Sequence, residues 1–111
     1  MKLKYSEVKP LRLERLQQQN NCCSLCGEVI EDDAVLDHDH KTGKVRHVLH
    51  RGCNALLGKI ENNMPRNRVS MTRLTGIANN LINYLNNEYP EIIHPTYKTQ
   101  EEKKLKRKKK R

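Results

Sequence analysis

The stretch AVLDHDHKTGKVRHVLHRGCNALLGK, residues 34–59, holds four of the chain's five histidines together with two aspartates, a cysteine and an asparagine. Residues 34–38 and 44–50 are predicted to form two strands joined by the turn KTGK. Gly43 can supply the positive φ that such a turn favours. The segment GCNALLGKIEN, residues 52–62, predicts a helix. The predicted order is therefore strand, turn, strand and helix.

Outward from this stretch, helices are predicted on both sides. Ser6 is the expected N-cap of a first helix, Pro10 fits only its first turn, and QNN at 19–21 ends it. NNMPRN at 62–67 predicts a break, and a further helix is expected over 69–87. That helix has apolar residues at helical spacing, namely Leu74, Ile77, Ala78, Leu81, Ile82 and Leu85.

These boundaries predict one small α+β domain with flanking helices. Residues 1–21 form the N-terminal helix, and 22–63 form the metal-bound core. Residues 64–97 are a helical extension, whose long apolar stripe makes it a candidate dimerisation element. Residues 98–111 are expected to be a basic, disordered tail.

The net charge of +9 has two sources. The last nine residues carry eight bases and no acid, and without them 14 bases face 13 acids, which leaves +1. Residues 41–75 hold eight bases and only one acid. Basic residues beside a cluster of candidate ligands suggest a polyanionic partner, with Lys44 and Arg51 as candidate phosphate contacts.

The composition predicts a thin core, because only 35% of the residues are hydrophobic and Trp and Phe are absent. Small domains of this kind usually add a metal, disulfides or a second subunit. No signal peptide and no membrane span is expected, so a reducing cytoplasm is the predicted compartment. Four cysteines in that compartment favour metal ligation.

Two pairs of metal-ligand residues flank the predicted hairpin. Cys23 and Cys26 form one pair and His50 and Cys53 the other, each with two residues between its members. Four such N and S ligands suit a structural zinc ion, whose binding would stabilise a weak core. Cys22 could replace Cys23, although the two-residue spacing favours Cys23.

The remaining candidates suggest a second metal. Alternation along a strand places Asp37 and Asp39 on one side and His38 and His40 on the other. The Asp37 carboxylate and the Asn54 amide oxygen suit Mg²⁺ or Mn²⁺, and a neutral His38 can take a proton from water. Two alternatives stay open: DHDH is a polar strand end, or its histidines are the zinc ligands.

The segments CSLCGEVI and LDHDHKTGKVRHVLHRGCN resemble the recombination endonuclease VII family, a branch of the ββα-metal (His-Asn-His-like) nucleases. The resemblance is close over residues 22–54 and looser beyond them. It implies a zinc-stabilised ββα-metal core and a phage or prophage origin. The sequence departs from the family pattern at two positions: His50 stands in place of the usual Cys, and His47 stands in place of a frequent Gly.

The resemblance also implies roles for individual residues. Cys23, Cys26, His50 and Cys53 would hold the structural zinc. Asp37 and Asn54 would bind a catalytic Mg²⁺ or Mn²⁺, His38 would be the general base, and His40 would lie near the scissile phosphate. Arg46 is a candidate phosphate contact.

The function expected from the sequence is that of a metal-dependent DNA endonuclease acting on branched DNA, as Holliday-junction resolvases do. One alternative is a phage nicking nuclease without structure preference, and another is a non-catalytic zinc-knuckle DNA-binding protein. DNA and a second copy of the chain are the expected partners, without a membrane or a small-molecule cofactor. The expected location is the bacterial host cytoplasm.

Overall fold

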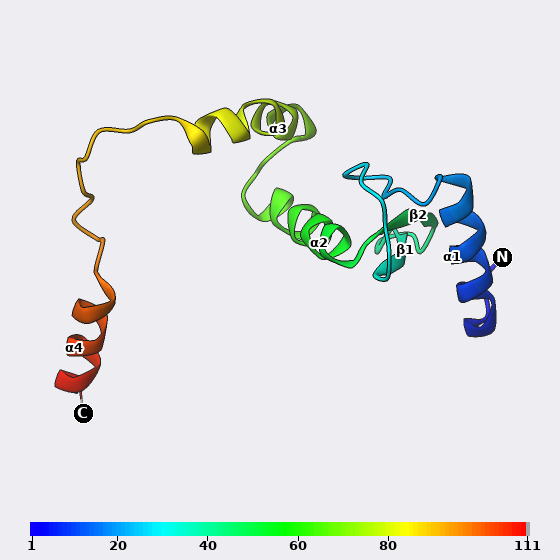
Figure 1. The fold of residues 1–111 in the computed structure, drawn as a ribbon, viewed down its shortest axis with the longest axis horizontal. Coiled ribbons are helices and arrows are strands. Elements are labelled where there is room, and N and C mark those ends of the chain that lie inside the picture. The colour runs from blue at the N-terminus through cyan, green and yellow to red at the C-terminus, as the bar shows by residue number, and fades with distance from the viewer. Residues whose placement is uncertain (111) are drawn as a thin grey trace. The chain divides into compact units, whose positions relative to one another are not determined.

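The computed structural model describes residues 1–110, and the chain divides into two compact units, Met1–Leu74 and a second that begins at Thr75. The two strands form one antiparallel sheet, and α1 and α2 both contact it (Figure 1). The predicted small α+β class, with its strand, turn, strand and helix, is therefore confirmed. The elements are α1 (Tyr5–Gln18), β1 (Ala34–His38), β2 (Val45–His50), α2 (Arg51–Arg66), α3 (Met71–Asn86) and α4 (Gln100–Lys110).

The hairpin contains a β-bulge at the DHDH sequence. Leu36 pairs with Val48, but the next pair is His38 with Val45, so two residues of β2 lie opposite Asp37 alone. A bulge of this kind bends the strand and changes the direction of its side chains. The irregularity thus falls at the position where a metal-ligating carboxylate was expected.

The turn after β1 is closed by Asp39 and Gly43. The Asp39 N–H donates to the Lys44 carbonyl at 2.9 Å, and the Gly43 N–H donates to the Asp39 carbonyl at 2.7 Å. Gly43 has φ 76°, as the turn prediction required. The Asp39 carboxylate accepts the backbone N–H groups of Lys41 at 2.8 Å and Thr42 at 3.3 Å. These bonds lower the pKa of Asp39, the Lys41 bond most, and give its side chain a structural role.

The core of the first unit is small, as the composition predicted. Its buried members are Cys23, Ile30, Val48 and Leu49. Partly buried apolar side chains from α1, the hairpin and α2 pack against them, including Leu16 and Leu57. The core therefore joins the segment from Cys23 to Ile30, the hairpin and both helices through very few buried residues.

Helix α1 is joined to the outer edge of β2 by one glutamine. The Gln19 amide donates to the Val48 carbonyl and accepts the Val48 N–H, each at 2.8 Å. The same amide nitrogen lies 2.8 Å from the Cys22 carbonyl. Gln19 thereby satisfies backbone groups of a strand that lacks a second neighbour in the sheet.

The helix ends differ in part from the predicted ones. The first helix has its N-cap at Lys4, whose N–H donates to the Glu7 carboxylate at 2.9 Å, so Ser6 is helical and Pro10 lies beyond the first turn. It ends as predicted, with Asn20 and Asn21 at positive φ. Helix α2 continues through the predicted break and includes Pro65 in its last turn.

The second unit is mainly helical, and most of its side chains are exposed. Helix α3 falls within the predicted range 69–87 and leaves Ile82 and Leu85 each 64% exposed. The tail was expected to be disordered, whereas residues 100–110 form α4. Thr99 caps this helix by accepting the Glu102 N–H at 3.1 Å, and acidic side chains favour its first turn. Arg111 lies outside the described residues.

Within residues 1–110, no helix combines the length and the apolar character needed to cross a bilayer.

Candidate functional site

The first cluster of functional side chains joins the two predicted ligand pairs. One ligand atom each from Cys23, Cys26, His50 and Cys53 lies within 4.8 Å of the others. The knuckle that turns at Gly27, with φ 83°, brings the first two cysteines together. His50 ends β2 and Cys53 lies in the first turn of α2, so the cluster lies where hairpin and helix meet.

His50 presents a defined nitrogen to the thiols. Its Nδ1 lies 3.3 Å from the Cys26 sulfur and 3.8 Å from the Cys53 sulfur. Its Nε2 lies 2.9 Å from the Val29 carbonyl, which can accept the N–H of that nitrogen. A backbone partner of this kind is what usually orients a zinc-bound imidazole, so Nδ1 is the atom suited to ligation.

The side chains of Cys23 and Cys22 point to different places, and only that of Cys23 belongs to the cluster. Cys23 is buried within the cluster, whereas the Cys22 sulfur lies 3.5 Å from the Asn20 carbonyl. The predicted preference for Cys23 is therefore supported by the geometry. Three thiols and one imidazole within this distance suit tetrahedral zinc, and the cluster could hold a structural zinc ion.

The pKa values of three cluster residues are shifted by burial and by hydrogen bonds within and around the cluster. Burial raises the pKa of Cys23, but hydrogen bonds from the Cys26 and His50 backbone and others lower it to about 6. The pKa of His50 is raised to about 9, mainly by the Val29 carbonyl and then by Cys23. Burial and the neighbouring thiols raise the pKa of Cys53 to about 11.

Asp37 is the buried carboxylate of the unit. Only 5% of its surface is exposed, and it accepts the Arg46 Nε–H at 2.6 Å and an Nη2–H at 3.3 Å. Asp37 and Arg46 also line a cavity of about 180 Å³ with Leu57 of α2. The carboxylate is therefore fixed in direction and lies beside a space between hairpin and helix.

The histidines of DHDH lie together and exposed. The ring centroids of His38 and His40 are 4.6 Å apart with an interplanar angle of 55°. The two rings lie side by side as predicted, although β1 ends at His38 and His40 lies in the turn. Within residues 1–110 no hydrogen bond joins either ring to Asp37, and none involves the side-chain amide of Asn54, in the first turn of α2.

The three predicted phosphate contacts differ in their surroundings. Lys44, at the end of the turn, and Arg51, at the start of α2, are exposed. Arg46 is bound to Asp37 and also to Glu61, a residue of α2 that the sequence analysis did not select. The available signal was that Glu61 is the sole acid among residues 41–75.

The hairpin, the helix α2 and the cysteine–histidine cluster together define a small α+β protein with a site suited to zinc. The family model described as recombination endonuclease VII matches residues 1–87. The chain belongs to the recombination endonuclease VII family, as its motifs predicted. The family's name indicates an endonuclease, a nuclease that acts on DNA.

Proposed function

We propose that this protein is a metal-dependent endonuclease that hydrolyses phosphodiester bonds in branched DNA. The observation that carries the proposal is the pairing of a buried, oriented carboxylate, Asp37, with exposed histidines one and three residues later in a chain of this family. Phosphodiester hydrolysis needs charge stabilisation beside the phosphate and a base for the attacking water.

The oxygen donors suit Mg²⁺ or Mn²⁺. Asp37 lines the cavity beside α2, and the amide of Asn54, in the first turn of α2, has no hydrogen-bond partner among residues 1–110. Carboxylate and amide oxygens are preferred ligands of these cations. We assign Asp37 and Asn54 as the residues that hold the cation. When bound, such a cation stabilises the negative charge that develops on the phosphate oxygens.

The reaction then depends on the histidines. His38 accepts a proton from the attacking water, whose oxygen bonds to phosphorus while the bond to the leaving oxygen breaks. His40, with its ring 4.6 Å from that of His38, binds the phosphate or assists the leaving oxygen. The zinc cluster fixes the end of β2 to α2, and so holds the strand carrying Arg46 against the helix carrying Asn54.

DNA binding is assigned to exposed basic side chains of the protein. Lys44 and Arg51 contact phosphates near the site, and the basic residues of α4 add sequence-independent attraction that weakens with salt. We place this activity in the cytoplasm of a phage-infected bacterium, on the resemblance of the motifs alone.

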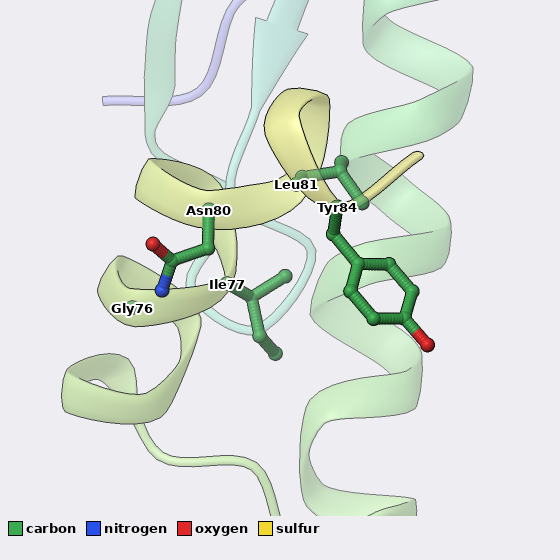
Figure 2. Close-up of a pocket in the computed structure, with 5 residues that line it drawn as sticks. All are labelled: Gly76, Ile77, Asn80, Leu81 and Tyr84. Carbon is green, nitrogen blue, oxygen red and sulfur yellow. The ribbon is translucent and has the colours of Figure 1, made fainter. Parts of the chain in front are cut away.

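A homodimer is proposed through α3. Figure 2 shows Ile77, Leu81 and Tyr84 on this helix, beside a hollow of about 380 Å³ that Gly76 and Asn80 also line. The apolar residues Ile82 and Leu85 are largely exposed on the same helix. A second copy of α3 would cover this surface, and two active sites would permit paired cuts in two strands.

The proposal is tested by His38→Ala, with His94→Ala as the control outside the site. Cleavage of a synthetic four-way junction in Mg²⁺ is expected to fall by at least about a hundredfold in His38→Ala, the usual contribution of a general base. Zinc content, circular dichroism and DNA binding should stay at the wild-type values. Loss of zinc in His38→Ala would show that the imidazole is a zinc ligand and would overturn the assignment.

A further inference from the structure

Arg46 is the centre of a polar group that spans three elements. Its Nε and Nη2 bond to the two oxygens of Asp37 on β1, at 2.6 and 3.3 Å. Its Nη1 and Nη2 bond to the two oxygens of Glu61 on α2, each at 3.0 Å. Nη2 also lies 3.4 Å from the His38 carbonyl. A planar guanidinium can hold two carboxylates in this way because its donors lie in a rigid fork.

The burial of the three side chains makes this arrangement effective. The Asp37 side chain is 6% exposed, the Arg46 side chain 33% and the Glu61 side chain 37%. The backbone of Arg46 is fixed as well, because its carbonyl accepts an N–H from the side-chain Nη1 of Arg15, on α1, at 2.8 Å. Arg46 is thus held on two sides, and its guanidinium is engaged within the protein.

The charges of the group have a consequence for a cation at Asp37. Asp37 and Arg46 alone sum to zero, so a divalent cation would approach a neutralised carboxylate. Glu61 adds one negative charge, and the three side chains together carry a net charge of −1. Such a group attracts a divalent cation more strongly than a neutral pair does, since opposite charges in a half-buried site interact with less screening.

We propose that Glu61 is a positioning residue of the metal site: it holds the Arg46 guanidinium against Asp37 and leaves the group with a net negative charge. Arg46, on this assignment, orients Asp37, while Lys44 and Arg51 bind phosphates. The assignment rests on the proposed function in so far as Asp37 is a metal ligand.

Glu61→Gln tests the proposal, because it removes the charge while keeping the size of the side chain. Glu14→Gln, at an exposed position of α1, is the matched control. The first measurement is NMR of the Arg46 guanidinium in zinc-loaded protein without Mg²⁺. Its N–H protons are expected to exchange with water at least about tenfold faster in Glu61→Gln, because their carboxylate partner is lost. Unchanged exchange would overturn the proposal.

The second measurement is the Mg²⁺ concentration that gives half-maximal cleavage of a synthetic four-way junction. It is expected to rise about tenfold in Glu61→Gln and to stay unchanged in Glu14→Gln. In an Arg46→Lys background the same substitution should raise it by a smaller factor, because the lost charge still weakens cation binding but no guanidinium remains to be held. Equal effects in both backgrounds would contradict action through Arg46.

The two measurements separate the inference from the proposed function. A wild-type protein that nicks no DNA but shows restrained Arg46 protons, released by Glu61→Gln, would refute the proposed function and keep the positioning role. If Glu61→Gln loses its zinc or its fold, Glu61→Asp replaces it. This shorter side chain keeps the charge but cannot reach both nitrogens, so faster exchange is again expected, and unchanged exchange again overturns the proposal.

Discussion

His50 shows how one substitution within a motif keeps the chemistry of a site. It stands where the family pattern usually has a cysteine, yet its Nδ1 lies within 4 Å of the Cys26 and Cys53 sulfurs. Its other nitrogen faces the Val29 carbonyl. Imidazole is an ordinary zinc ligand, and here the backbone partner fixes its orientation.

Zinc affinity is expected to rise with pH. In the metal-free cluster the pKa of His50 is about 9 and that of Cys53 about 11, so both groups carry protons near neutrality. Zinc must displace both protons, and its affinity should therefore increase by at least about a hundredfold per pH unit between about pH 6 and 8.

Competition with a chelator at several pH values measures this slope. Cys22→Ala, whose sulfur lies outside the cluster, should give the same slope as the wild-type protein. An affinity that does not change with pH would show that the cluster is not bound through these two groups.

At the scale of the elements, α1 is joined to β2 by hydrogen bonds of Gln19 that no sequence pattern predicts. Gln19 follows the last turn of α1 and bonds to both backbone groups of Val48, which is completely buried. A glutamine after a helix has no periodic signal, and its partner lies 29 residues away.

Gln19→Ala is expected to lower the free energy of unfolding by about 2 kcal/mol, because the buried Val48 N–H would lose its partner and the Val48 carbonyl would keep only the Ser24 N–H, at 3.3 Å. Gln18→Ala, at the neighbouring exposed position, should change it by less than about 0.5 kcal/mol. Denaturant unfolding of the zinc-loaded protein measures both values. Equal effects of the two substitutions would mean that the Gln19 bonds contribute nothing.

The predictable parts of the site are those with a local pattern. The Cys-x-x-Cys and His-x-x-Cys spacings predicted the cluster that the structure brings together. The prediction that His38 and His40 lie together also agrees with the structure, although His40 lies in the turn beyond β1 and not in the strand. The group of Asp37, Arg46 and Glu61 was not predictable, because it depends on how α2 packs on the hairpin and on the bulge opposite Asp37.

The tail shows the opposite limit. Its run of basic residues predicted disorder, but that prediction left out the helix-capping residues at the start of the tail. The Thr99 hydroxyl accepts the Glu102 N–H at 3.1 Å and donates to the Glu102 carboxylate at 3.2 Å. A threonine N-cap of this kind satisfies a backbone donor and favours a helix start. The charge pattern of the tail therefore predicts a polyanionic partner, but it could not predict the secondary structure of the tail.

For the whole molecule, the exposed apolar side of α3 predicts self-association. Wild-type protein at micromolar concentration should scatter light as a particle of twice the 13.0 kDa chain mass. Leu81→Glu combined with Leu85→Glu should weaken the dimer by at least about a hundredfold, because charges would be buried in an apolar interface.

Asn83→Glu, on the polar side of the same helix, is the control and should leave the dimer intact. The folded state of each variant is checked by its zinc content and circular dichroism. A wild-type protein that scatters only as 13.0 kDa would contradict the proposed dimer.

The central claim is metal-dependent cleavage of branched DNA, and one measurement tests it most directly. A synthetic four-way junction and a linear duplex with the same arms are incubated with zinc-loaded protein, in Mg²⁺ and in EDTA. Cuts are expected at the junction in Mg²⁺ only, with the duplex left intact. Equal cutting of both substrates would contradict the branched-DNA substrate, and binding without cutting of either would contradict the enzyme itself.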